Sequence, residues 1–490
     1  MATGGPTVVA NDKPMANNVV LQGILPGAPA PLLLVGQHLD AAAAAWSAQN
    51  YRVTVTPLCD PEVWAQHPCG TRQGVLQAEL WPQQAERASF AVAIVSDVSP
   101  HVHPLALFDQ LTGWLAVDAV LVLTGSHTPD PVPRVRRWLD YVVAIGARCG
   151  FEPVPLEEAA TNPADGSFVR VFRKMAQPRW QLRHVRAGDF AEIAELFQEV
   201  FGHPLTRGLW EWKYANGRGN AVAASRDGVM IAHYGGIYRE IMLCGQPDWA
   251  YGGSDVMVHP KERGVMTRQG PFLLTAACTA EMYGPVAFGF PTERAMLVAE
   301  RMGLYTKAGQ MAEVRWEPAA PGLRLRTRVR PLDRTSGHDA AMVDRLWTGM
   351  AHDLHADVVG VRDWKYLEHR YCHHPHNSYE LLCVTARLTG KPLGLLVMRR
   401  LEASCELLDV IGPLANLPLL VDQARRMTAR WGLPSLYCWI TTNHAARFVA
   451  CGGAEVELNV HIPTSCWTDD PRVDQLKGRW WLMPGDTDFR

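Results

Sequence analysis

The chain has 490 residues, too many for one hydrophobic core, and at roughly 100–200 residues per domain it predicts several domains. Hydrophobic residues make up 48% and charged residues 20%, and 47 basic against 49 acidic residues give a net charge of −2, which predicts no attraction to nucleic acid or to an anionic membrane. The 11 cysteines include no Cys-x-x-Cys pair and the apolar runs are too short to span a membrane, which favours a reduced, cytoplasmic protein.

Residues 1–30 are rich in Ala, Gly, Pro and Asn and lack a basic stretch followed by an apolar core. This composition predicts a disordered lead-in and no signal peptide. Short apolar runs then alternate with helical segments over residues 31–176, which predicts a doubly wound α/β sheet. The expected strands and helices are Pro31–Gly36, Leu39–Gln49, Tyr51–Thr56, Phe90–Val95, Pro104–Leu115 and Val117–Thr124.

The order of these segments resembles a class I methyltransferase that uses S-adenosylmethionine, mainly in Phe90–Gly125 and Cys149–Val154. The resemblance implies a Rossmann-like, methyltransferase-type domain. The turn Gly36–Asp40 carries one glycine where the family has two or three, which let the cofactor approach the main chain. Asp60 is placed to hold a ribose or is an ordinary loop carboxylate. We expect a degenerate domain with a structural or docking role, and active methyl transfer is the alternative.

Two later segments of the sequence carry the same signature. The matching pairs, each 157 positions apart, are Glu211 with Glu368, Lys213 with Arg370, and Tyr214 with Tyr371. Asp255 and Asp409 keep nearly the same offset. A repeat of about 150 residues indicates a duplicated domain rather than a solenoid. We place the copies at residues 177–318 and 319–466, each an α/β domain with a mixed sheet. A C-terminal tail, residues 467–490, follows them. We expect this tail to dock back onto the body, and it is a candidate contributor to the acceptor site.

The first copy resembles the GNAT superfamily of N-acyltransferases, particularly its duplicated bacterial forms. Asp255–Pro260 is similar to the central strand of that family, Arg263–Met266 to a shortened form of its Gly-rich loop, and Phe288–Glu293 to its closing strand. The resemblance implies an acyl-CoA, above all acetyl-CoA, as substrate. Backbone N–H groups at a helix N-terminus bind the pyrophosphate of such a molecule. The expected CoA-binding residues are Met257, Val258, Arg263, Gly264, Val265, Met266 and Thr267.

Acylation of an amine needs a base, an oxyanion site and an acid for the leaving thiolate. By resemblance, the backbone of Met257 and Val258 supplies the oxyanion contact. Asp255, on the central strand, is the candidate base, directly or through water, or is a buried structural carboxylate. Tyr305 is the candidate acid, because Ala299 occupies the position where many members of the family carry a tyrosine; a packing role is the alternative.

Two further candidates for the chemistry are His259 and Glu293. His259 follows the central strand. Either it takes part in the chemistry, or its side chain simply faces solvent. Glu293 opens the last helix of the first copy, where a carboxylate is favoured by the helix dipole alone. The second copy has no arginine and no Gly-rich turn after Asp409–Leu414, so we expect it to bind no CoA and to wall off the acceptor pocket.

A histidine-rich segment and two tryptophan pairs complete the candidates. His369 and His373 have the i, i+4 spacing of a metal site on a helix, but Pro375 breaks that helix and no second ligand group follows, so we expect no metal. The tryptophan pairs, which have strand- or edge-like spacing and are interpreted as packing anchors, are Trp210 with Trp212 and Trp480 with Trp481.

The sequence as a whole predicts an α/β protein in which a Rossmann-like methyltransferase-type domain precedes two GNAT-like domains. The expected function is acyl transfer, above all acetyl transfer, from CoA to an amine of a small molecule or an amino sugar. A carrier protein or a second copy of the chain is a further candidate partner. The alternatives are a non-catalytic scaffold that binds acyl-CoA or a carrier protein, and an S-adenosylmethionine-dependent methyltransferase.

Overall fold

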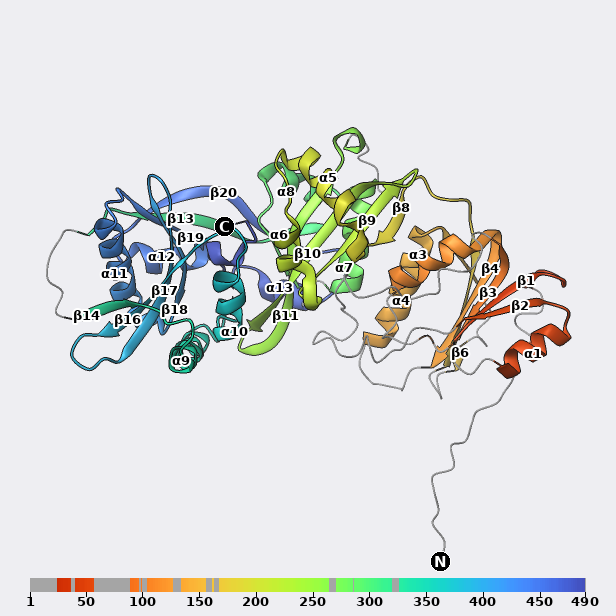
Figure 1. Ribbon diagram of the computed structural model, residues 1–490, viewed down its shortest axis with the longest axis horizontal. Coiled ribbons are helices and arrows are strands. Elements are labelled where there is room, and N and C mark those ends of the chain that lie inside the picture. The colour runs from red at the N-terminus through yellow and green to blue at the C-terminus, as the bar shows by residue number, and fades with distance from the viewer. Residues whose placement is uncertain are drawn as a thin grey trace, which may run out of the picture. The chain divides into compact units, whose positions relative to one another are not determined.

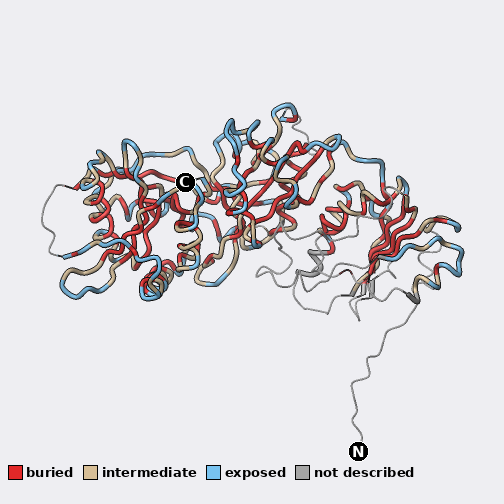
Figure 2. Tube along the Cα trace, in the orientation of Figure 1, coloured by how far each residue is buried: buried red, intermediate tan, exposed pale blue. Residues whose placement is uncertain are grey.

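The computed structural model describes residues 24–36, 40–56, 89–96, 98, 104–126, 134–155, 161–162, 167–263, 270–284, 286–319 and 326–489. The chain forms two compact units, of which the first ends at His184 and the second begins at Val185 (Figure 1). Each unit has a buried interior of its own along its strands (Figure 2). No helix within the described ranges is both long and apolar enough to cross a membrane.

The first unit contains a mixed sheet in the order β2-β1-β3-β4-β7-β5, with β6 beside β7. Strands β1 to β4 run parallel, and β7 runs antiparallel to both β4 and β5. The elements are β1 (Pro31–Val35), α1 (Asp40–Ala48), β2 (Arg52–Thr56), β3 (Phe90–Val95), α3 (Pro104–Trp114), β4 (Leu115–Ser126), α4 (Arg134–Arg148), β5 (Phe151–Val154), β6 (Thr161–Asn162) and β7 (Ser167–Lys174). The strand β8 (Gln181–His184) follows and is not part of this sheet.

The strands and helices expected over residues 31–124 are all present. The apolar runs of β1, β3 and β4 are buried, whereas β2 at the sheet edge is partly exposed. The resemblance to a methyltransferase stays a prediction. Asp60, Gln37–Leu39 and most of the loop after β3 lie outside the described residues.

The second unit begins with the elements of the first copy. They are η5 (Ala187–Asp189), α5 (Phe190–Phe201), α6 (Arg207–Tyr214), η6 (Ala215–Gly217), β9 (Gly219–Arg226), β10 (Val229–Leu243), β11 (Gln246–Val258), η7 (Pro260–Glu262), α7 (Pro271–Tyr283), β12 (Ala287–Phe288), α8 (Glu293–Arg301) and β13 (Tyr305–Trp316). Trp210 and Trp212 are buried on α6, so their expected strand-like spacing was wrong: helix α6, capped by Thr206, contains the whole segment.

The second copy repeats this order. Its elements are β14 (Thr327–Pro331), α9 (Gly337–Asp353), β15 (Val358–Gly360), α10 (Trp364–Leu367), η8 (Glu368–Cys372), β16 (Glu380–Ala386), β17 (Pro392–Arg400), β18 (Cys405–Ile411), η9 (Leu414–Asn416), α11 (Leu417–Arg430), β19 (Leu436–Thr441), α12 (Thr442–Val449) and β20 (Ala454–Ser465). The C-terminal tail adds α13 (Arg472–Leu476), β21 (Trp480–Trp481) and η10 (Pro484–Asp486).

The two copies exchange strands. Strand β13 ends the first copy, yet it lies between β19 and β20 in the sheet β14-β16-β17-β18-β19-β13-β20. In the other direction, β15 pairs with the far end of β10, and β21 of the tail pairs with β15, in the sheet β12-β11-β10-β15-β21. Each sheet therefore needs strands from both halves of the unit.

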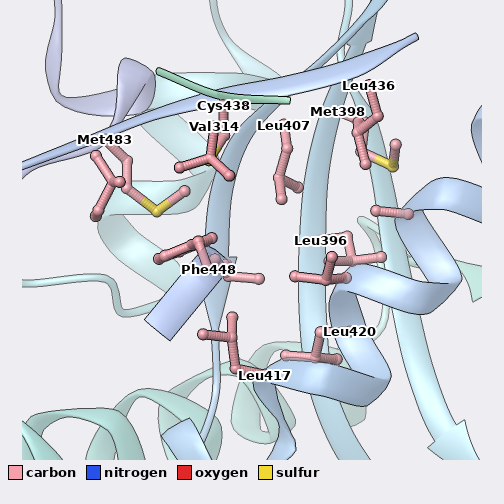
Figure 3. Close-up of a cluster of buried hydrophobic side chains, with 14 of the residues drawn as sticks. Val314, Leu396, Met398, Leu407, Leu417, Leu420, Leu436, Cys438, Phe448 and Met483 are labelled. Carbon is pink, nitrogen blue, oxygen red and sulfur yellow. The ribbon is translucent and has the colours of Figure 1, made fainter. Parts of the chain in front are cut away.

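The core of the second copy shows the same exchange in its side chains (Figure 3). Val314 of β13 and Met483 of the tail pack with residues of the second copy such as Leu396, Leu407 and Phe448. All of these side chains are fully buried. At about 25 cal/mol per Å² of buried apolar surface, this shared core opposes separation of the two copies.

Candidate functional site

A cleft opens in the first copy where two parallel strands separate. The pairing of β11 with β12 covers only Tyr251 with Ala287 and Gly252 with Phe288. Beyond these pairs, Gly253–Val256 on one side and Phe288–Thr292 on the other line a cleft of about 660 Å³. The cleft follows directly from this divergence, because the backbone of β11 has no partner strand on this side within the described residues.

A β-bulge at Asp255 accounts for the divergence. Between the pairs Gly235–Ser254 and His233–Met257, β11 has one residue more than β10, and Asp255 adopts a left-handed φ of 50°. A bulge of this kind bends its strand and re-aims its side chains. The buried His233 donates from Nδ1 to the backbone carbonyl of Asp255 at 2.8 Å. Burial lowers the pKa of His233, so its ring is neutral and carries its proton on Nδ1.

Lys213 holds two carboxylates at the floor of the cleft. Its Nζ lies 2.8 Å from Asp255 Oδ1 and 2.8 Å from Asp488 Oδ2. Tyr214 donates to the other Asp255 oxygen at 2.8 Å, and Ser254 donates to Asp488 Oδ2. Both oxygens of the predicted base are thus already hydrogen-bonded.

The ionisation of this cluster is set by its partners. Burial alone would lower the pKa of Lys213, but Asp255 and Asp488 raise it above its ordinary value. Burial alone would raise the pKa of Asp488, but Lys213 and Ser254 lower it below its ordinary value. Lys213 is therefore a permanent cation, and Asp488 stays ionised at neutral pH.

Two tyrosine hydroxyls meet on another wall of the cleft. Tyr305, the first residue of β13, and Tyr234 of β10 share a hydrogen bond between their hydroxyl groups. Burial raises the pKa of Tyr234 to about 12, and burial together with Tyr234 raises the pKa of Tyr305 well above its ordinary value. Both groups are therefore protonated at neutral pH and can act as proton donors.

The rest of the lining comes from both copies and the tail. Aromatic and apolar side chains dominate it: Phe197, Phe201, Leu209, Phe272, Phe288, Phe290 and Phe489. His374, His376 and Asn377 reach the cleft from the second copy, and Pro463–Ser465 reach it from the end of β20. The cleft is therefore complete only when both copies and the tail are in place.

The candidates proposed from the sequence fall into two groups. Asp255 and Tyr305 line the cleft. His259 instead pairs its Nε2 with Glu199 at 2.7 Å, and Glu293 is exposed at the first turn of α8.

The expected CoA-binding residues follow the cleft segment of β11. Met257 is buried in the core of the first copy. The Val258 carbonyl accepts a hydrogen bond from Nε of the exposed Arg263 at 2.9 Å. Gly264, Val265, Met266 and Thr267 lie outside the described residues.

Sequence reasoning did not single out Lys213, Tyr234, Asp488 or Phe489, although it named the whole tail, residues 467–490, as a candidate contributor to the acceptor site. Lys213 had a signal, since it belongs to the repeated signature, although we interpreted it only as a mark of duplication. Asp488 had none, because its partner Lys213 is 275 positions away in the chain.

The histidine-rich segment is used in packing. His369 stacks on Trp212 with ring centroids 5.2 Å apart, and His374 packs on the same ring at 4.6 Å. His376 bonds to Thr206 at 2.7 Å. Within the described ranges, no group of three His, Cys, Asp or Glu side chains is arranged to hold a metal ion.

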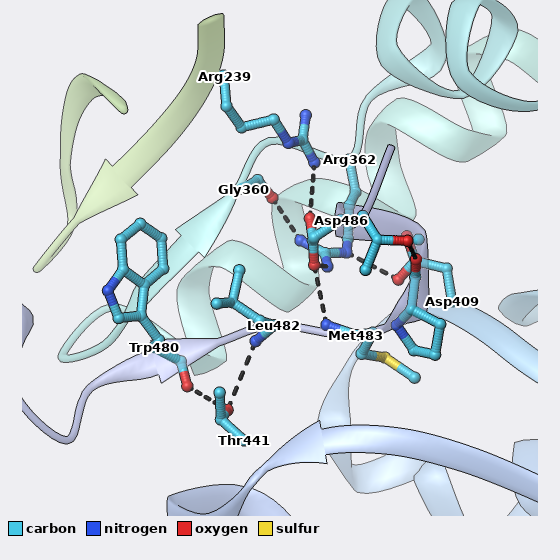
Figure 4. Close-up of polar contacts among 12 residues, drawn as sticks. Arg239, Gly360, Arg362, Asp409, Thr441, Trp480, Leu482, Met483 and Asp486 are labelled. Atoms are coloured by element: carbon cyan, nitrogen blue, oxygen red, sulfur yellow. Dashed lines mark hydrogen bonds and ion pairs between the residues drawn. The ribbon is translucent and has the colours of Figure 1, made fainter. Parts of the chain in front are cut away.

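The equivalent region of the second copy is filled by the tail (Figure 4). Strands β18 and β19 pair only at Cys405–Leu436 and Glu406–Tyr437. Pro484–Asp486 of the tail contacts both strands beyond that point. Thr441, the last residue of β19, donates to the Trp480 carbonyl, and Leu482 N–H donates to Thr441 Oγ1 at 3.5 Å.

Charged groups fix the tail in this position. The fully buried Arg362 bonds to Asp409 at 2.8 Å and to Asp486 at 2.6 Å (Figure 4). Arg370, the repeat partner of Lys213, donates to the carbonyls of Gly485 and Thr487, each at 2.9 Å. Tyr371 donates to Asp409 at 3.0 Å, as Tyr214 does to Asp255. The duplicated Tyr–Asp bond is thus present in both copies.

Comparison with known proteins gives one family match. A model described as an acetyltransferase (GNAT) domain matches residues 181–306. A search of curated proteins finds no match to this chain. The family match and the cleft support a GNAT-type acyltransferase enzyme that uses an acyl-CoA.

Several solved structures are similar to this chain. One is a probable N-acyltransferase from Enterococcus faecalis V583, with 12% identity over 58% of this chain and 72% of that chain, at a TM-score of 0.47. Another is a tandem GNAT protein from the clavulanic acid biosynthesis pathway, with 10% identity over 59% of this chain and 100% of that chain, at a TM-score of 0.41. A third is the N-myristoyltransferase of Saccharomyces cerevisiae, with 9% identity over 59% and 80% of the two chains, at a TM-score of 0.39.

Proposed function

We propose that the first copy transfers an acetyl group from acetyl-CoA to the amine of a small molecule within the cleft between β11 and β12. One observation carries the proposal: the cleft joins a strand edge without a partner among the described residues, a buried carboxylate and a pair of protonated tyrosines in one space. An unpaired strand edge can hydrogen-bond an extended pantetheine arm as an added strand would. In the second copy the tail fills the equivalent region, which supports assigning the reaction to the first copy.

The reaction needs two proton movements. The amine nitrogen, after losing a proton from its ammonium form, attacks the thioester carbonyl, a C–N bond forms and the C–S bond breaks. The departing thiolate takes up a proton from the acid and leaves as CoA thiol. The base accepts the proton lost by the ammonium and releases it to solvent, from which the acid is reprotonated.

We assign the proton donor to Tyr305, with Tyr234 hydrogen-bonded behind it. The proton acceptor is Asp255 acting through a water molecule, since both of its oxygens are already bonded to Lys213 and Tyr214. Backbone N–H groups of Met257 or Val258, which follow the bulge on β11, are the candidate oxyanion donors.

Calorimetric titration with acetyl-CoA and, separately, with S-adenosylmethionine tests the proposal. We expect acetyl-CoA to bind with micromolar affinity and Arg263→Ala to weaken this binding, because the guanidinium adds charge beside the pyrophosphate. Arg294→Ala, on the exposed first turn of α8, is the matched control and should bind normally. Binding of neither ligand would reject the enzyme and leave a scaffold role.

The same titration tests the first unit. Binding of S-adenosylmethionine alone would favour methyl transfer, for which the parallel strands β1 to β4 with intervening helices are the supporting observation.

A further inference from the structure

We infer that the acceptor is a cationic amine with an apolar, aromatic body, an arylalkylamine, and that Asp488 and Phe489 of the tail bind it. The inference rests on the proposed acyl transfer in the first copy, and it narrows the acceptor from any small-molecule amine to one chemical class. It also assigns the tail residues Asp488 and Phe489 a role in binding substrate.

The charge of the cleft favours a cation. Among the described lining residues, the Lys and Asp side chains are Lys213, Asp255 and Asp488, which together carry one net negative charge. Burial lowers the pKa of His374 to about 3, so this lining histidine is neutral at pH 7. An ammonium group compensates the surplus carboxylate, whereas an anionic group on the acceptor is repelled by it.

Asp488 is the carboxylate within reach of such a ligand. Its side chain is 18% exposed, while that of Asp255 is 4% exposed, and Asp488 lines the cleft. Both strong bonds to Asp488, from Lys213 and Ser254, go to the single oxygen Oδ2. A carboxylate fixed in this way is preoriented, which lowers the entropy cost of binding an ammonium.

Aromatic side chains also line the cleft. Phe201 is 45% exposed and Phe489 is 56% exposed, unusual values for phenylalanine in a folded protein. Phe197 and Phe201 have ring centroids 4.7 Å apart, and Phe489 meets Phe290 edge-on at 6.4 Å. Such rings bury an apolar body and attract an ammonium through their π faces.

The tail is held firmly enough to serve as a wall. Gly485 and Thr487, just before Asp488, give their carbonyls to the buried Arg370, and Asp486 is paired with Arg362. The Asp488 carboxylate is therefore placed by contacts in the second copy, while it faces the cleft of the first. The support from the second copy explains how Asp488, in the tail, takes up a defined position.

The test compares two acceptors of similar shape with the full-length chain and acetyl-CoA. Phenethylamine is cationic at pH 7, and O-benzylhydroxylamine is neutral with the same ring and chain length. We expect phenethylamine to have a kcat/KM at least tenfold above that of phenylalanine, which adds a carboxylate, and above that of glucosamine, which lacks the ring.

Asp488→Asn should raise KM for phenethylamine about tenfold to a hundredfold, the loss of one charge-assisted hydrogen bond. It should leave KM for O-benzylhydroxylamine within about threefold and leave the Kd of acetyl-CoA unchanged. Asp474→Asn, on the exposed face of α13, is the matched control and should change neither KM. Phe489→Ala should raise both KM values, and Phe489→Leu should restore most of the loss.

Two outcomes overturn the inference while the proposed function stands: a preference for glucosamine, and an equal rise of both KM values in Asp488→Asn. Acetyl-CoA binding without turnover of any amine overturns the proposed acyl transfer together with the inference. An equal rise would mean that Asp488 only shapes the site. Failure to bind acetyl-CoA rejects the proposed function itself and is read from the calorimetric titration before any acceptor is added.

Discussion

Replacement of Tyr305 by phenylalanine is the sharpest test of the proposed chemistry. The change removes one oxygen and keeps the ring at the start of β13. A positioned general acid contributes about 10²- to 10⁴-fold in rate. Burial and the adjacent Tyr234 hold the pKa of Tyr305 well above its ordinary value, while the pKa of a thiol is about 8.5.

This mismatch of pKa values sets the size of the effect. A tyrosine is a weaker acid than the thiol that it would protonate, so complete proton transfer in the transition state is uphill by about 1.4 kcal/mol per pKa unit. We therefore expect the low end of the range, a fall in kcat of about 10²-fold, or about 2.7 kcal/mol. The Kd of acetyl-CoA should stay within about twofold, because the hydroxyl acts on the leaving group.

The assay is steady-state release of CoA thiol, followed with a chromogenic disulfide at saturating acetyl-CoA. Tyr283→Phe, a buried tyrosine of α7 that does not line the cleft, is the control for removal of a hydroxyl. In the wild-type enzyme, Tyr305 should cause no alkaline decline of kcat below about pH 10, since it keeps its proton there. A Tyr305→Phe variant that retains kcat within threefold would show that this residue only packs.

Three further predictions concern the tail and its supports. Arg362→Met leaves Asp409 and Asp486 buried without their shared cation and should destabilise the second unit by about 3–5 kcal/mol, measured by urea unfolding. The control Arg400→Met, at an exposed ion pair, should lower the free energy of unfolding by under about 1 kcal/mol. Equal losses in the two variants would refute the argument. Gly485→Ala places a Cβ 2.0 Å from the Tyr371 hydroxyl and should cost about 1–3 kcal/mol, whereas Gly337→Ala, with open space around it, should be neutral or stabilising. Burial lowers the pKa of His444 to about 4, below the unfolded value of about 6.5. Protonation of His444 therefore favours the unfolded chain, and the free energy of unfolding falls as the pH drops below about 6.5. The expected loss between pH 7.5 and 5.5 is about 1 kcal/mol. His444→Gln should flatten this part of the thermal stability profile, and an unchanged slope would contradict the assignment.

Features that depend on neighbouring residues could be predicted from the sequence. Apolar runs located the strands and helices of the first unit, since burial of a strand or of a helix face is visible in local periodicity. The repeated signature also paired positions that are structurally equivalent: Tyr214 and Tyr371 donate to the corresponding Asp255 and Asp409. A duplicated signature survives in sequence because the same buried bond is needed twice.

Features made by distant residues could not be predicted. Strand β21 is only Trp480–Trp481, too short for an alternating pattern, and its partner β15 is three residues long. The metal hypothesis for His369 and His373 assumed an ordinary helical turn. The segment is instead a π-turn, in which His373 N–H donates to the Glu368 carbonyl at 3.0 Å, so the i, i+4 side chains do not align.

The different fates of the two copies follow from their charges. At the filled cleft of the second copy, Arg239 from β10 of the first copy pairs with Asp486, and Arg362 pairs with both Asp409 and Asp486. Arg370 is a third cation beside these two carboxylates, and its donors are taken up by the tail carbonyls of Gly485 and Thr487. In the first copy, Lys213 is the cation paired with Asp255 and Asp488 among the described residues, so the surplus there is negative. A chain segment can satisfy surplus cations with its own carbonyl oxygens, but a surplus carboxylate next to an open cleft needs a donor from outside. The same duplicated Tyr–Asp frame thus closes one cleft on the tail and leaves the other suited to an ammonium ligand.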